Sequence, residues 1–203
     1  MSNHNEKMTE LLKNGKPSLL KEKHGVVTMN NMFVGEDHLC IQQHTTLNTS
    51  LVAFSEEILK QAGYSLTSED GQRKTFRCEL PVFGSCTVTV HDSGISGKNL
   101  VGQVVVKTKW KISEAKMLKM LEYMKQTIGK EPYFDDHGYG VGPRPHEIDL
   151  RWDLLQGRIG MTWSGFNYPD REDCVFITLR DRDFLQAVEN KESYGYFHYE
   201  DID

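Results

Sequence analysis

The sequence predicts an α+β fold, a two-layer sandwich in which a mainly antiparallel sheet of about six strands carries helices on one face. Strands are indicated by segments after residue 73 that alternate apolar and polar residues with a period of two. Helices are indicated by three segments that repeat apolar residues every three or four positions. After an N-terminal arm, the predicted order is helix, three strands, helix, three strands, helix.

The arm, residues 1–49, is predicted to hold a short helix and a hairpin. Apolar residues share one helical face over 5–14, and Asn14-Gly15 ends that helix. Over 25–43, two short apolar runs flank a polar turn at Gly35-Glu36-Asp37, which indicates a pair of strands.

Residues 50–203 form the predicted α+β domain. Ser50 is expected to cap a first helix that Gly63 ends, with strands over 74–80, 85–91 and 100–110 following. Ser113 is expected to cap a second helix that Gly129 ends. Further strands are predicted over 147–154, 158–163 and 174–180, and Asp181 is expected to cap a last helix.

The two halves of this domain contain a weak internal sequence repeat, which we call the internal echo. The segments "CELPVFGSCTVTV" and "WDLLQGRIGMTW" both run strand, glycine-containing turn, strand, offset by one residue. The echo suggests a duplication, although hairpins with glycine turns also converge on this pattern.

Composition limits the classes of partner. The net charge of −5 provides no basic field for nucleic acid and favours a basic protein partner. The sequence shows no signal peptide and no window that would span a bilayer, so we expect a cytoplasmic protein without membrane contact. The four cysteines lack metal-site spacing and are expected to be free thiols.

The stretch "DDHGYGVGPRPHEIDLRW", residues 135–152, has the densest chemistry in the chain. Its H-x-E-x-D pattern suggests metal binding or acid–base catalysis. If 146–153 is a strand, however, His146 lies on the face opposite Glu147 and Asp149, because side chains alternate. We therefore expect this strand to have a solvated acidic face on one side and a core face on the other.

A metal site remains the alternative for the same stretch. Asp135, Asp136 and His137 could provide ligands, with His146 folding back toward them. Ordinary loop chemistry accounts for the same residues, since Asp and Gly satisfy turns locally.

The glycines of the stretch do not form a nucleotide-binding loop. Gly138, Gly140 and Gly142 follow a predicted helix and precede a strand, the reverse of the order that phosphate binding requires. We instead expect a loop over 135–145 that contacts a partner through Tyr139 and Arg144.

Nucleophilic catalysis is weakly supported. Cys78 and Cys86 fall on the apolar faces of their strands, where a thiol behaves as a small hydrophobe. His91 and Asp92 could form a dyad, but a turn at that position explains them better.

The C-terminal segment combines aromatic anchors with acidic residues, a composition typical of binding surfaces. Its predicted partner contacts are Tyr194, Tyr196, Tyr199, Glu200 and Asp201. Alternatively, the aromatic residues complete the core while the acidic ones stay in water.

These observations lead to a non-catalytic protein-binding module without a cofactor, acting as an inhibitor, immunity factor or chaperone. In element order the chain resembles secretion chaperones and related dimeric binding folds, which implies that it could form a homodimer. The alternative is a metal-dependent hydrolase that uses Asp135, Asp136, His137 and His146. A small-molecule pocket beneath the loop over 134–145 is a third hypothesis.

Overall fold

The structure is a computed structural model that describes residues 33–41, 45–61, 63–95, 99–108, 112–135, 147–164 and 174–190. The N-terminal region has strands β1 (Phe33–Val34), β2 (Leu39–Ile41) and β3 (Thr45–Thr46). The first half of the main region has α2 (Leu51–Leu59), β4 (Ser65–Glu69), β5 (Arg73–Leu80), β6 (Gly84–Asp92) and β7 (Val101–Thr108). The second half has α3 (Glu114–Ile128), β8 (Tyr133–Asp135), β9 (Glu147–Leu154), β10 (Gly157–Ser164), β11 (Cys174–Asp181) and α4 (Arg182–Glu189).

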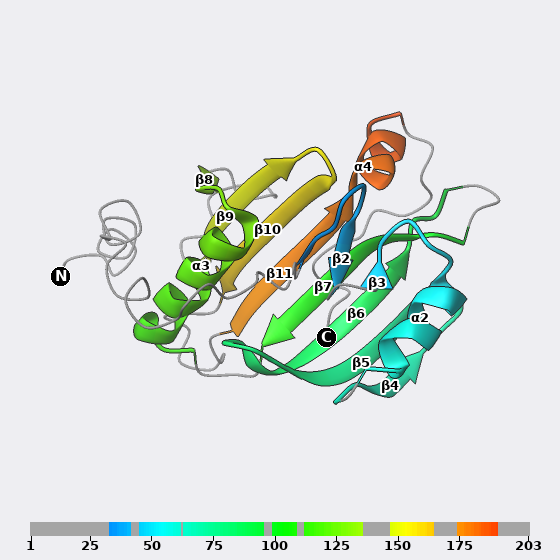
Figure 1. Cartoon of the computed structure of the whole chain (residues 1–203), viewed down its shortest axis with the longest axis horizontal. Coiled ribbons are helices and arrows are strands. Elements are labelled where there is room, and N and C mark those ends of the chain that lie inside the picture. Colours follow the sequence, from blue (N-terminus) through cyan, green and yellow to red (C-terminus); the bar gives the residue numbers. More distant parts are fainter. Residues whose placement is uncertain are drawn as a thin grey trace.

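The protein is mostly β and is dominated by one large antiparallel sheet (Figure 1). The sheet has eight strands in the order β4-β5-β6-β7-β11-β10-β9-β8, and the smaller sheet has three in the order β1-β2-β3. The prediction of an antiparallel sheet with helices is confirmed, but the predicted order omitted β4 and β8. Every residue of β4 is exposed, so it has no apolar alternation, and β8 is only three residues long.

The strand order gives the large sheet two similar halves. Each half is a four-stranded meander, and the two meet where β7 pairs antiparallel with β11. The two echoed segments occupy corresponding hairpins, β5–β6 and β9–β10. In each, a glycine opens the returning strand opposite a leucine: Gly84 pairs with Leu80, and Gly157 with Leu154. This correspondence supports the internal echo seen in the sequence.

The helices α2 and α3 and the small sheet lie over one face of the large sheet (Figure 1). Phe83 connects α3 to the small sheet, because its ring packs edge-on against Phe33 of β1 and Tyr123 of α3. The buried core residues of the large sheet on this face include Phe76, Val88, Val104, Val106, Trp152, Ile159, Met161, Ile177 and Leu179.

Local signals for the helix starts are confirmed. The Ser50 hydroxyl accepts a hydrogen bond from the Ala53 amide, and the Ser113 hydroxyl accepts one from the Lys116 amide. Gly129 ends α3 in the left-handed conformation, with φ of 73°. The first predicted helix, 5–14, lies outside the described residues. Within the described ranges, no helix is long and apolar enough to cross a bilayer.

The described part of the predicted arm contributes to the same core. Strands β1 and β2 form the hairpin expected around Gly35-Glu36-Asp37, with Phe33 opposite Cys40. Phe33, Leu39 and Ile41 are all fully buried within the main hydrophobic cluster. The arm residues near 33–41 therefore pack on the large sheet.

Candidate functional site

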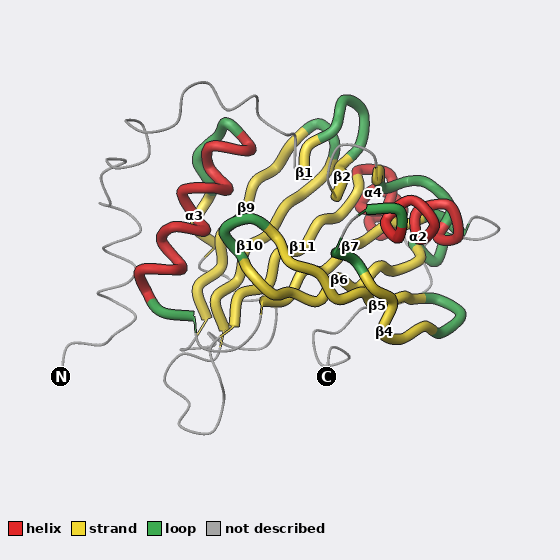
Figure 2. The backbone as a smooth tube through the Cα atoms, turned by 60° about the horizontal axis from the view of Figure 1, so that its bottom comes forward, coloured by secondary structure: helices red, strands yellow, loops and turns green. Residues whose placement is uncertain are grey.

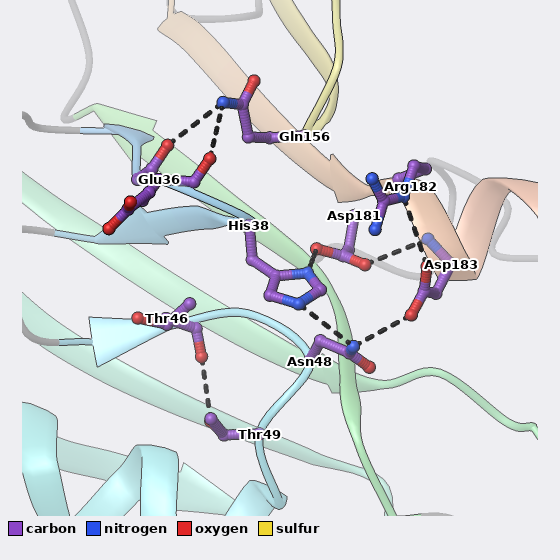
Figure 3. A network of polar contacts seen from close by, with 10 residues as sticks. Glu36, His38, Thr46, Asn48, Thr49, Gln156, Asp181, Arg182 and Asp183 are labelled. Atoms are coloured by element: carbon purple, nitrogen blue, oxygen red, sulfur yellow. Dashed lines mark hydrogen bonds and ion pairs between the residues drawn. The ribbon is translucent and has the colours of Figure 1, made fainter.

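A network of polar side chains joins the small sheet to the end of β11 (Figure 3). His38, between β1 and β2, places its Nδ1 atom 2.9 Å from Oδ2 of Asp181, the last residue of β11. The Asp181 side chain is 1% exposed, whereas the His38 side chain is 23% exposed. The carboxylate is therefore buried behind an imidazole that reaches solvent.

The second oxygen of Asp181 is also occupied. Its Oδ1 atom accepts a hydrogen bond of 3.0 Å from the Asp183 amide, the N-cap contact of α4 that the sequence predicted. Burial raises the pKa of Asp181, while the bonds from the Asp183 amide and from His38 oppose that effect. Because both oxygens are engaged, the carboxylate has a fixed orientation.

Asn48 extends the network on the other side of the imidazole. Its Nδ2 atom donates to Asp183 Oδ2 at 2.9 Å and lies 3.5 Å from His38 Nε2. This geometry fits an imidazole that carries its proton on Nδ1, donates it to Asp181, and presents Nε2 as an acceptor. Asn48 has a φ of 64°, in the left-handed region that asparagine tolerates better than most residues.

A further contact fixes the hairpin that carries His38. The Gln156 amide, in the β9–β10 turn, donates to the carbonyl oxygens of Gly35 and Glu36 at 3.2 and 3.0 Å (Figure 3). Chemically, an aspartate–imidazole pair can orient a general base. Here, however, the acceptor nitrogen faces the Asn48 amide, so the network is better explained as a clamp between the small sheet and the large one.

The second candidate is the face of the large sheet opposite the core, which we call the outer face. Strand register aligns its side chains in three rows that cross six strands. The central row is Thr75, Thr89, Val105, Thr178, Gly160 and Arg151. One flanking row is Arg77, Thr87, Lys107, Phe176, Thr162 and Asp149, and the other is Arg73, His91, Gln103, Arg180, Arg158 and Asp153.

The rows differ in the size and charge of their side chains. Between Thr75 and Gly160 the central row holds only short, neutral residues, and the flanking rows carry the long cationic side chains. The ammonium group of Lys107 lies 5.5 Å from the centre of the Phe176 ring. On the other side, Arg180 Nε donates to Gln103 Oε1 at 2.9 Å. A neutral strip thus runs across the strands between two cation-bearing rows.

The acidic residues of the outer face lie at one end of it. Asp153 pairs with Arg158 at 2.7 Å and with Arg151 at 3.1 Å, and Asp149 accepts a hydrogen bond from Thr162 at 2.6 Å. Although the chain has a net charge of −5, cationic side chains outnumber acidic ones in the three rows. The outer face therefore suits an anionic ligand.

The alternation predicted for the H-x-E-x-D stretch agrees with the structure where the side chains are described. Leu150 and Trp152 are buried on the core face, and Asp149 and Arg151 occupy the outer face. Asp135 belongs to β8, opposite Asp149. The other proposed ligands (Asp136, His137 and His146) lie outside the described residues, and the described part of the chain contains no group of three or more potential metal ligands.

The predicted partner contacts also lie outside the described ranges. They are Tyr139, Arg144, Tyr194, Tyr196, Tyr199, Glu200 and Asp201. Sequence reasoning missed His38, Asn48 and Asp183 and the rows of the outer face. The clamp joins residues that are 143 positions apart in the chain, so no motif spacing could have indicated it.

The buried thiols and His91 offer no reactive group at neutral pH. All four cysteines are buried thiols, and burial raises the pKa of Cys40 and Cys78 to about 11 and that of Cys86 to about 12. Burial also lowers the pKa of His91 to about 4. Asp92 accepts a hydrogen bond from the Gly94 amide, which supports the turn interpretation over a catalytic dyad.

Comparison with known proteins adds no family to these observations. No protein-family model matches the chain, and no curated protein or solved structure is significantly similar to it.

Proposed function

We propose that this chain is a non-catalytic protein-binding module, acting as an inhibitor, immunity factor or chaperone, that binds an extended acidic segment of its partner across the outer face. The observation that carries the proposal is the strip from Thr75 to Gly160, bordered by Lys107 and Phe176 on one side and by Arg180 on the other. Short residues leave room for a ligand backbone, while long cations recognise its charge.

The sign of the partner's charge follows from the outer face and not from the whole chain. A net charge of −5 favoured a basic partner, but the surface described above is cationic. The strip from Thr75 to Gly160 crosses five strands at about 4.8 Å spacing and is therefore about 19 Å long, which accommodates roughly six residues of extended chain. The predicted contacts in the loop over 135–145 would add to this surface.

Charge reversal on the outer face tests the proposal. Immobilised full-length chain is used to capture a stoichiometric protein partner, whose affinity is then measured for Lys107→Glu/Arg180→Glu and for Lys119→Glu, an exposed change on α3. We expect the double variant to bind about tenfold more weakly or worse, because it repels an acidic ligand, and Lys119→Glu to bind as the wild type does.

Two outcomes would overturn the proposal. One is the absence of any stoichiometric protein partner. The other is a partner that both variants bind equally well, because the outer face would then have no part in recognition. Thermal unfolding of each variant verifies that reduced binding does not reflect an unfolded sheet.

A further inference from the structure

The central row of the outer face is more buried than a sheet face in water should be. Val105 is 2% exposed, Thr178 5% and Thr89 9%. An antiparallel sheet normally exposes the face that does not contact the core. Here the described helices lie on the core side: α2 and α3 above the sheet (Figure 2), and α4 through Phe184, which approaches Gly102.

The chemistry of the outer face defines what would cover it. An occupant should carry negative charge to complement Lys107 and Arg180, and apolar or aromatic groups to contact Val105 and Phe176.

One segment of this chain has that composition and follows the helix that starts at the end of the outer face. Residues 191–203, "KESYGYFHYEDID", follow α4 directly and combine four aromatic residues with an acidic end, Glu200-Asp201-Ile202-Asp203. α4 itself starts next to Arg180, at one end of the outer face. Thirteen extended residues reach about 43 Å, whereas the eight residues of β7 span about 26 Å.

We propose that residues 191–203 bind across the outer face as an intrachain ligand, with the aromatic side chains over Val105 and Thr178 and the acidic end near Lys107. Docking of the segment does not depend on the function proposed above. Its regulatory consequence does rest on that function: an acidic partner would have to displace the segment, so the chain would be partly autoinhibited.

Zero-length cross-linking of the full-length chain tests the docking. A water-soluble carbodiimide joins a lysine amine to a carboxylate only when the two are in contact. We expect mass spectrometry to find Lys107 coupled to Glu200, Asp201 or Asp203 in the monomer fraction. Lys107→Arg is the matched control, because arginine keeps the charge but cannot couple, and it should remove this product alone.

An equal mixture of isotopically light and heavy chains separates an intrachain contact from one between two copies. We expect only light–light and heavy–heavy products, whereas mixed products at the statistical share would overturn the proposal in favour of a second copy. Absence of the Lys107 product in the wild type would also overturn it, leaving the flanking Lys107 and Arg180 side chains as the cover of Val105.

A second variant tests the proposal without relying on Lys107. Thr178→Arg places a long cation on the central row, where it should obstruct the aromatic side chains. We expect chymotrypsin to cleave after Tyr194, Tyr196 or Tyr199 about tenfold faster in this variant than in the wild type, because cleavage follows the undocked population. Equal rates in two folded proteins would contradict docking. If docking holds but charge reversal leaves partner binding unchanged, only the proposed function fails.

Discussion

His38 and Asp181 lie 143 residues apart in sequence, yet their side chains meet at 2.9 Å and fasten the small sheet to the start of α4. We predict that His38→Ala destabilises the fold by about 1–3 kcal/mol, because it leaves a nearly inaccessible carboxylate without its imidazole donor. Urea denaturation followed by circular dichroism measures the change. Lys60→Ala is the control, since its ion pair with Glu57 is exposed to solvent and should contribute little to stability.

One specific result would contradict the stability loss predicted for His38→Ala. If His38→Ala and Lys60→Ala shift the denaturation midpoint equally, the contact between His38 and Asp181 does not hold the two sheets together. His38→Asn offers a second variant, because its shorter amide can still donate toward the region of the carboxylate. We expect its stability to lie between that of the wild type and that of His38→Ala.

Acid sensitivity should arise from His91. Burial lowers the pKa of His91 to about 4 from an ordinary 6.5, so the unfolded chain takes up this proton first as the pH falls. The stability that neutral His91 contributes is therefore complete above pH 6.5 and is lost progressively between about 6.5 and 4, by up to about 3 kcal/mol.

Comparison with His91→Gln isolates this effect. The variant should lose less stability than the wild type between pH 7 and 4, as measured by urea denaturation at each pH. Asp181 acts in the opposite direction: because its pKa is raised in the folded state, its contribution is lost as the pH rises through that value. Asp181 is present in both proteins, so its effect cancels. Parallel pH profiles would contradict the assignment to His91.

The contact between β7 and α4 depends on a glycine. A Cβ atom at Gly102 would lie 2.6 Å from the Phe184 ring and 2.8 Å from the Ser93 Cβ. We predict that Gly102→Ala costs about 1–3 kcal/mol through overpacking, measured by chemical denaturation. Gly71→Ala is the matched control, since nothing lies within 4 Å of its Cβ position.

A double-mutant cycle assigns the cause of that loss. Phe184→Leu removes part of the ring that the new methyl group would meet, so Gly102→Ala should cost less in the Phe184→Leu background than in the wild type. Additive costs would show that α4 does not limit the space at Gly102.

Much of the fold was predictable because the periodic spacing of apolar residues along the sequence indicates its strands and helices. The alternation of Val104 with Val106, and of Leu150 with Trp152, placed their strands correctly, and Ser113 and Asp181 marked helix starts. β4 was not predictable in this way, since a strand exposed on both faces carries no apolar period.

The candidate sites could not be predicted for a different reason. The rows of the outer face exist only once register sets Lys107 opposite Phe176 and Gln103 opposite Arg180, and these pairs come from strands about seventy positions apart. The same holds for the clamp between His38 and Asp181. Sequence reasoning instead concentrated on neighbours in the chain, such as His146 and Glu147, which alternation assigns to opposite faces of the strand predicted there.

The two corresponding hairpins of the sheet lead to a last prediction. Gly84 and Gly157 each open a returning strand with positive φ, 77° and 145°. A Cβ at Gly84 would meet only the flexible Lys116 side chain, whereas at Gly157 it would collide with the Arg180 carbonyl oxygen. We predict a cost of about 1 kcal/mol for Gly84→Ala and about 3 kcal/mol or more for Gly157→Ala, measured by urea denaturation. Gly84→Asn should be nearly neutral, because asparagine tolerates left-handed backbone. Equal losses for the two alanine variants would mean that the hairpins do not differ in this way. The expected asymmetry follows from packing, since the Gly157 backbone lies against the end of β11, directly beside Arg180 and the clamp residue Asp181.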